Sequence, residues 1–411
     1  MGSDGVLTRY RSGKSYTINK ERQATHFTIQ GVTGVRKPLH ILMAGNSELV
    51  IFGFRGELVQ RLVAEGHRVT TVFPVTEFGS GRESAARYGC DFEEIRINGH
   101  GKNPIEDAAL FFHYLALLRR KRPDVLLTFT IKPNVYAGLA ARMLGIPVIA
   151  NITGVGVAIE HRGPVRFAAA ALYRAALKQP TAVFFQNTEN MALFDSLKIA
   201  PERRILLPGS GVNLERFSAL PYPDDAGGVH FLFIARIMKK KGIRYYLDAA
   251  KAIRAGRTDV TFHILGAMSE PEYEPEIRAH AAEGTLVYHG LTEDVRPFLR
   301  ACHCVIHPTY YPEGMSNVLL ESFASARPAI ATDRAGCREI IDDGINGYLC
   351  RERDSESLIR AIETFLALDN AARAAMGQRA RRKAESAFDR NIVVEQYLTE
   401  IDRACKGGKN E

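Results

Sequence analysis

The segment PEGMSNVLLE, residues 312–321, places two carboxylates eight positions apart. Glu313 precedes a Gly-Met-Ser-Asn turn, whereas Glu321 lies in otherwise largely apolar sequence. Ser316 or Asn317 can cap a helix that begins near Val318, and Glu321 would then lie roughly 6 Å along the helix axis from the cap. A carboxylate in apolar sequence is costly to bury unless it is hydrogen-bonded or paired, and hydroxyl groups would be suitable partners.

A second group of polar residues could bind an anion. The expected strand HFLFIAR ends at Arg236, and Lys241 with Gly242 opens the next helix. The N–H groups and dipole of a helix N-terminus favour phosphate, and two cations would add charge. The alternative is a solvated basic turn, because residues 239–241 are all lysine.

The two groups together suit a nucleotide sugar. Its diphosphate would lie across the N-terminus of the helix near Val318, with ribose hydroxyls on one side and hexose hydroxyls on the other. Each end would then receive one carboxylate, from Glu313 or Glu321. The alternative is that these are two unrelated surface glutamates.

An alternation of apolar strands and helices positions these residues. Strand, helix and strand at this spacing predict parallel sheets, in which ligands bind at the carboxyl ends of the strands. The expected strands are 38–44, 68–73, 92–97, 124–130, 146–153, 182–187, 230–236, 260–266, 286–290, 305–309, 329–332 and 347–350. The expected helices are 56–64, 105–121, 136–145, 162–178, 191–197 and 242–254.

The length of 411 residues exceeds what one core usually supports, which favours two domains with a site in the cleft between them. We expect α/β architecture with two doubly wound, Rossmann-like domains. Residues 38–212 form the first and residues 213–388 the second. Residues 389–411 form a C-terminal helix that packs back toward the first, and the polar residues 1–37 form a mobile extension.

The net charge of +8 predicts an anionic partner. Residues 115–122 and 162–178 combine basic and apolar side chains, as a helix on an anionic membrane surface would. The alternative is that their basic face lies in water. We expect no nucleic acid partner, because no basic stripe with interleaved aromatic residues occurs. No apolar run of eighteen residues and no signal peptide pattern occurs, so a cytoplasmic location is expected.

The sequence gives little sign of a metal or redox cofactor. The segment Cys302-His303-Cys304 resembles a ligand set, but strand alternation would send His303 to the face opposite both cysteines. No Asp-x-Asp occurs at a strand end, and Arg236 with Lys241 could neutralise a diphosphate instead. A nicotinamide enzyme is disfavoured, because no G-x-G-x-x-G follows the first strand. We therefore expect no metal and no cofactor besides the nucleotide sugar.

The motifs of residues 236–350 resemble the C-terminal half of family 4 retaining glycosyltransferases of the GT-B fold. The motifs are Arg236 with Lys241-Gly242, the pair Glu313 and Glu321, Gly336 with Glu339, and DDGINGYLC at 342–350. GSGVNLERF at 209–217 is similar to the segment that joins the two domains of this family, and the likeness extends over 38–400. The resemblance implies two Rossmann-like domains that face a central cleft, the second of which binds the nucleotide sugar.

The same resemblance implies a donor site. Arg236 and Lys241 would bind the diphosphate, Glu313 the sugar hydroxyls near the reacting carbon, and Glu321 the ribose. Arg236, Lys241 and Glu313 would be the catalytic residues. The further donor contacts would be Gly53, Phe54, Arg55, Gly290, Leu291, Gly314, Met315, Ser316 and Asn317.

The first half is similar to enzymes that extend sugars linked to undecaprenyl diphosphate in O-antigen, capsule or bacterial N-glycan assembly. The similar segments are IFGFRGELVQRL at 51–62, residues 131–156 and TEN at 188–190. This implies an acceptor-binding domain and a peripheral location on the inner face of the cytoplasmic membrane. The acceptor, a lipid-linked glycan, would contact Lys132, Asn134, Thr153, Gly154 and Arg166. ANITGVG at 150–156 lacks the histidine that many relatives carry there, so no catalytic histidine is assigned.

The implied reaction moves a hexose, expected to be an N-acetylhexosamine, from a UDP-sugar with retention of configuration. The departing phosphate would take the acceptor proton on the front face, so the enzyme would mainly position the reactants and neutralise charge. Two alternatives remain open at this point: a UDP-sugar 2-epimerase of the same fold, and a non-catalytic sugar-nucleotide binder.

Overall fold

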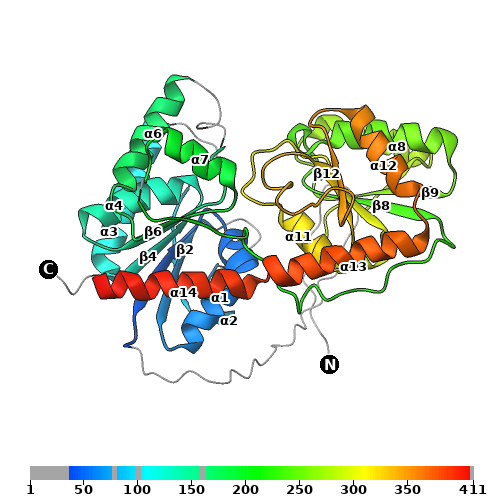
Figure 1. Ribbon diagram of the computed structural model, residues 1–411. Coiled ribbons are helices and arrows are strands. Elements are labelled where there is room, and N and C mark those ends of the chain that lie inside the picture. Colours follow the sequence, from blue (N-terminus) through cyan, green and yellow to red (C-terminus); the bar gives the residue numbers. More distant parts are fainter. Residues whose placement is uncertain are drawn as a thin grey trace, which may run out of the picture. The chain divides into compact units, whose positions relative to one another are not determined.

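The computed structural model describes residues 37–75, 81–97, 103–156, 159, 163–200 and 202–407. The expected mobile extension therefore lies outside the described residues, apart from Lys37, and so does Arg162 of the expected basic helix. Residues 38–411 form one compact unit. Within it the alternation of strands and helices builds two separate parallel sheets (Figure 1).

The first sheet has seven parallel strands in the order β3-β2-β1-β4-β5-β6-β7. The strand order reverses between β1 and β4, so the carboxyl ends of these strands flank the usual ligand crevice of such sheets. The strands are β1 His40–Ala44, β2 Arg68–Phe73, β3 Asp91–Glu94, β4 Val125–Phe129, β5 Val148–Ile152, β6 Ala182–Phe185 and β7 Arg204–Leu206.

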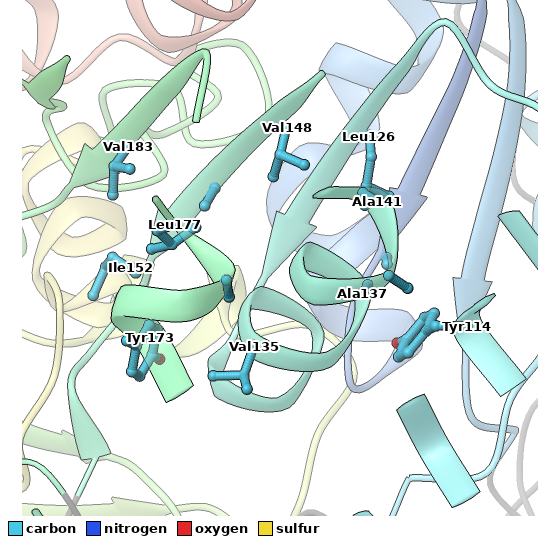
Figure 2. Packing of buried hydrophobic residues seen from close by; sticks show 14 of the residues in the cluster. Tyr114, Leu126, Val135, Ala137, Ala141, Val148, Ile152, Tyr173, Leu177 and Val183 are labelled. Atoms are coloured by element: carbon cyan, nitrogen blue, oxygen red, sulfur yellow. The ribbon is translucent and has the colours of Figure 1, made fainter. Parts of the chain in front are cut away.

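Helices cover the first sheet and bury its strands, and every residue of β4 and β5 is buried. Figure 2 shows part of this core, in which strand residues such as Leu126 and Val148 and helical residues such as Val135 and Ala141 form one buried cluster. The helical elements are η1 Leu49–Gly53, α1 Phe54–Ala64, α2 Gly81–Arg87, α3 Pro104–Lys121, η2 Pro133–Ala137, α4 Gly138–Met143, α6 Pro164–Ala176 and α7 Thr188–Ser196.

The start of the first helix differs from the prediction. The loop expected before Gly56 is instead a π-helical turn, η1, that continues directly into α1 at Phe54. Gly53 and Phe54 are therefore helical. The apolar stretch LVIFG gives no local signal for a π-turn, which depends on tertiary packing.

The second sheet has six parallel strands in the order β10-β9-β8-β11-β12-β13, with the order reversing between β8 and β11. The strands are β8 Val229–Ile234, β9 Val260–Leu265, β10 Leu286–Tyr288, β11 Cys304–His307, β12 Ala329–Thr332 and β13 Gly347–Cys350. Two doubly wound parallel sheets with covering helices confirm the predicted α/β class.

The helical elements after β8 are η3 Lys239–Lys241, α8 Ile243–Gly256, η4 Pro271–Tyr273, α9 Glu274–Ala282, α10 Arg296–Ala301, α11 Asn317–Ala324, α12 Ser355–Leu366, α13 Asn370–Ala387 and α14 Arg390–Gly407. Among them, η3 carries the predicted donor residue Lys241, and α11 carries Asn317 and Glu321. None of the helices in the described part of the chain has the length and apolar character that crossing a bilayer requires.

The last helix, α14, packs on the first sheet rather than the second. Its residues Val393, Tyr397 and Ile401 belong to the same core as β1 and β2. In Figure 1, α14 lies at the red end of the chain beside α1. The hydroxyl of Tyr397 accepts a hydrogen bond of 2.7 Å from Asn151 of β5. This bond connects α14 to the carboxyl end of β5.

The cysteines near β11 are arranged differently from the prediction. Cys302 ends α10 and packs with Leu232 and Leu299, whereas Cys304 begins β11 and packs with Phe231. The two thiols therefore belong to different cores instead of sharing a face. The expected alternation failed because the strand begins only at Cys304.

Candidate active site

The predicted phosphate-binding lysine and sugar-binding glutamate meet at the edge of the second sheet. Lys241 ends the turn η3, and its Nζ forms an ion pair with Oε1 of Glu313. Both side chains are largely buried, with exposures of 14% and 17%. Gly242 follows with φ +81°, and a Cβ there would collide with the carbonyl oxygen of Pro308. The glycine therefore lets the lysine turn lie directly against the segment that leads to Glu313.

The surroundings of Lys241 disfavour its protonated form. Burial, and then the nearby Arg236, lower the pKa of Lys241 to about 8 from the usual 10.5. Arg236 itself follows β8 and is exposed. Two cations that oppose each other in this way are suited to an anion, because a bound phosphate would stabilise both.

The N-terminus of α11 lies beside this pair. Ser316 is the N-cap, and its Oγ accepts a bond of 3.4 Å from the backbone N–H of Leu319. Ser316 rather than Asn317 is thus the cap. The backbone N–H of Ser316 donates to the carbonyl of Gly336 at 2.9 Å, so this N–H, expected to face a phosphate, is used within the protein.

His307 is a site residue that the sequence reasoning did not assign. It ends β11, is buried, and its Nε2 lies 3.1 Å from Oγ of Ser316 and 4.0 Å from Oε2 of Glu313. Burial, and then Lys241, lower the pKa of His307 to about 3, so the ring is neutral at physiological pH. Its position at a strand end next to the loop was the only signal available.

Glu321 is the isolated carboxylate that the sequence suggested. Burial raises its pKa to about 7, although Arg390 and Arg216 act in the opposite direction. Within the described residues, no hydrogen-bond donor is found for this carboxylate. A partly buried carboxylate without a donor in the described part of the chain is suited to a ligand that brings hydroxyl groups.

Two further loops border the site. The N–H of Gly336 donates to Oε2 of Glu339 at 2.7 Å, and a Cβ on Gly336 would lie 3.1 Å from the carbonyl oxygen of Gly314. The loop after β12 therefore packs directly on the Glu313 loop. Gly290 and Leu291 follow β10, where Gly290 accepts a backbone bond from Gly266 and Leu291 is exposed.

Comparison with known proteins gives the family of the chain. Residues 228–367 match the family model "Glycosyl transferases group 1", and residues 55–209 match "Glycosyl transferase 4-like domain". The chain is 23% identical over 372 residues to N,N'-diacetylbacillosaminyl-diphospho-undecaprenol alpha-1,3-N-acetylgalactosaminyltransferase of Campylobacter jejuni, covering 87% of this chain and 96% of that protein.

A second relative is the UDP-Gal:alpha-D-GlcNAc-diphosphoundecaprenol alpha-1,3-galactosyltransferase of Escherichia coli, 23% identical over 274 residues, or 63% of this chain and 70% of that protein. The crystal structure of Anabaena HepE in complex with UDP and glucose has the same fold, with a TM-score of 0.73 at 17% identity, over 89% of this chain and 100% of that one. The chain is a GT-B glycosyltransferase.

In this glycosyltransferase the predicted donor contact Arg55 lies in the interior. Its side chain is 4% exposed, its Nη1 donates to the carbonyl of Val50 at 2.8 Å, and its guanidinium lies 4.1 Å from the centre of the Phe129 ring. Burial lowers the pKa of Arg55. The side chain of Arg55 therefore packs inside the fold, and a contact of residues 53–55 with the donor stays a prediction.

The predicted acceptor contacts are not equally available. Lys132 is paired with Asp107 at 2.7 Å, and Asn134 is buried with its amide on the carbonyl of Asn151 at 2.9 Å. Asn134 therefore supports β5 through its amide N–H₂ group, and its contact with an acceptor stays a prediction. Thr153, Gly154 and Arg166 stay partly exposed.

Two hollows of the glycosyltransferase were not predicted. The first, of about 450 Å³, is polar and adjoins Glu313 through Pro312; it is lined by Glu189, Lys240, Tyr310, Pro312, Asp333, Arg334, Arg338, Glu352 and Arg353. The second, of about 480 Å³, is an apolar groove among α3, α4 and α6; it is lined by Pro104, Asp107, Ala108, Phe111, Tyr136, Leu139, Met143 and Leu172. Neither has a sequence motif, because each set comes from several separate segments.

Proposed function

We propose that this glycosyltransferase moves a hexose, an N-acetylhexosamine, from a UDP-sugar to a sugar carried on undecaprenyl diphosphate. The observation that carries the proposal is the ion pair of Lys241 and Glu313 at the N-terminus of α11, together with the carboxylate of Glu321 one turn along, for which the described residues supply no hydrogen-bond donor. The names of the two enzyme relatives, which describe sugars on diphosphoundecaprenol, support the acceptor class.

In the proposed donor complex each group has a separate task. The diphosphate would lie against Arg236, Lys241 and the N-terminus of α11, which together supply positive charge. The phosphate would replace Glu313 as the partner of Lys241, so the carboxylate of Glu313 would become free to bind the hexose hydroxyls. Glu321 would accept hydrogen bonds from the ribose hydroxyls.

The proposed reaction retains the configuration of the sugar. The oxygen of the departing UDP would take the proton of the acceptor hydroxyl while the acceptor attacks on the same face. Arg236 and Lys241 would stabilise the negative charge that develops on UDP, so we propose that the residues of this chain do this without a resident metal ion or other cofactor. His307, neutral and bonded to the cap Ser316, would hold the α11 terminus in place.

The first half of the chain supplies the features that suit a lipid-linked acceptor. The apolar groove among α3, α4 and α6 lies beside exposed apolar side chains, and Phe112 and Phe167 are 63% and 71% exposed. Arg166 stands next to Phe167 on α6. We propose that this surface meets the anionic inner face of the bacterial cytoplasmic membrane, which would bring the lipid-linked sugar to Thr153 and Gly154.

A single assay tests the proposal against its alternatives. The protein is incubated with a panel of UDP-sugars, each with and without a synthetic undecaprenyl-diphosphate-linked sugar. We expect UDP release that depends on the lipid acceptor, together with a longer glycan by mass spectrometry. An epimerised donor without any acceptor would instead indicate a 2-epimerase, and binding without turnover would indicate a sugar-nucleotide binder.

A further inference from the structure

The loop that carries Glu313 is held by a side chain from the other half of the chain. Asn187 follows β6 of the first sheet and is fully buried. Its Nδ2 donates to the carbonyl oxygens of Glu313, at 3.2 Å, and of Gly314, at 2.6 Å. One amide therefore fixes two successive peptide groups at the predicted catalytic carboxylate.

The other end of the same amide is also used. Oδ1 of Asn187 accepts a bond of 2.8 Å from the backbone N–H of Asn190 and so caps α7. The cap fixes which way the amide faces, and this orientation presents the N–H₂ group to the Glu313 loop. An aspartate could make the cap equally well, but it could not donate to the two carbonyls.

The loop is packed closely enough that its position depends on these contacts. A Cβ on Gly314 would lie 2.6 Å from the carbonyl oxygen of Thr153 and would also collide with Oε1 of Gln186. A Cβ on Gly154 would lie 3.2 Å from the carbonyl oxygen of Pro312. The backbone after β5 and the side chains of Gln186 and Asn187 after β6 thus contact the Glu313 loop directly.

We propose that Asn187 is a positioning residue for Glu313. By holding the carbonyls of residues 313 and 314, it sets the backbone from which the Glu313 carboxylate is directed at the donor sugar, and it touches neither substrate itself. The direction of this carboxylate then depends on the first sheet, whose Thr153 and Gly154 are the proposed acceptor contacts. The inference rests on the proposed transfer reaction and adds a residue that would position one of its catalytic groups.

The test separates capping from positioning. Asn187→Asp and Asn187→Ser keep a capping oxygen for α7 but remove the donation to residues 313 and 314. We expect turnover with the lipid-linked acceptor to fall about 10- to 100-fold, in the range of a displaced catalytic group. The dissociation constant for UDP should change less than about 3-fold, since Arg236, Lys241 and Glu321 would hold UDP.

The matched control is Asp369→Asn, which exchanges the same two side chains at another helix cap. Asp369 caps α13 through Ala372 and has no contact with the Glu313 loop. Turnover of this variant should match the wild type. Wild-type turnover for Asn187→Asp would overturn the proposal, because the cap alone would then explain Asn187.

A double-variant cycle identifies the residue through which Asn187 acts. In a Glu313→Gln background, Asn187→Asp should lower turnover by less than about 3-fold, because the group it positions is already impaired. The same loss in both backgrounds would show that Asn187 does not act through Glu313, and would overturn the inference.

Amide hydrogen exchange keeps the inference testable if the transfer reaction itself is not found. Absence of acceptor-dependent turnover by the wild type would count against the proposed function alone. Peptides covering 312–320 should still exchange faster in Asn187→Asp than in the wild type or in Asp369→Asn. Equal exchange in all three proteins would contradict the positioning role.

Discussion

The carboxyl-end edges of the two sheets carry side chains of different chemical character. At the second sheet, Lys241 and Glu321 are partly buried ionisable groups, and desolvation is the main cause that brings their pKa values to about 8 and about 7. At the first sheet, Lys132 is already paired with Asp107, and the main feature is an apolar groove. Ionisable groups with strongly shifted pKa values mark a site for a compact, highly charged molecule, whereas a groove lined by apolar side chains suits a lipid-linked one.

The largest effect should come from removing Lys241 at the edge of the second sheet, which we call the donor edge. Lys241→Ala should lower kcat/KM for the UDP-sugar about 10³-fold, because the diphosphate and the developing charge on UDP both lose a cation. Steady-state kinetics with the lipid-linked acceptor measure this. Lys240→Ala is the matched control on the same turn, and an equal loss there would show that only the general basic character of residues 239–241 matters.

The next effect concerns Glu321 and separates binding from stability. Glu321→Gln should weaken UDP binding about 10-fold by calorimetry, because a neutral amide is a poorer acceptor for two hydroxyls than a carboxylate. The same change should raise the free energy of unfolding at pH 8 by roughly 1–3 kcal/mol, since it removes a buried charge. Weaker UDP binding without any gain in stability would contradict the account of this residue.

The sign of the pH dependence follows from the pKa of Glu321. The native carboxyl keeps its proton up to about pH 7, whereas the unfolded chain loses it near the usual 4.5. The native state thus binds more protons between these values, and this group makes the free energy of unfolding fall as pH rises through that window. The stability gain of Glu321→Gln should therefore vanish below about pH 4.5.

A smaller effect is expected from the titration of Lys241. The free protein loses the proton of Lys241 near pH 8, whereas a bound diphosphate would retain it. UDP affinity should therefore fall about 3- to 10-fold between pH 7 and pH 9. Lys241→Arg should flatten this dependence, because an arginine stays charged throughout, and an unchanged pH profile would contradict the role of Lys241.

The smallest effect should come from the apolar groove. Leu139→Asn places an amide among apolar lining residues and should raise KM about 3-fold for an acceptor with a long prenyl chain. KM for a short-chain analogue should not change. Equal effects on both acceptors would show that the groove does not bind the prenyl chain. The proposed role of the first sheet in binding the lipid-linked acceptor would then be wrong.

The sequence carried more information on the donor edge than on the corresponding edge of the first sheet, the acceptor edge, and the reason is physical. Glu321 could be identified because a carboxylate in apolar helical sequence conflicts with the local environment. The six strands of the second sheet were predicted because strand and helix alternate there at regular spacing. The cap at Ser316 was one of two candidates and follows from ordinary helix-capping chemistry.

The features that were missed depend on tertiary contacts between distant segments. The π-turn at 49–53 buries Arg55, although its sequence gave no sign of it. Asn187 contacts residues more than a hundred positions away, so the local sequence around it gave no sign of these bonds. The polar and apolar hollows likewise assemble from separate helices and loops, so no spacing rule could reveal them.

The central claim is that Glu313 serves the reacting sugar while Arg236, Lys241 and Glu321 hold UDP. The most direct test compares turnover and UDP binding in Glu313→Gln. The claim predicts that turnover falls about 10²-fold while the dissociation constant for UDP changes less than about 3-fold, because the lost interaction would belong to the sugar and the transition state. Equal losses in turnover and in UDP binding would contradict it, since Glu313 would then be part of the nucleotide site.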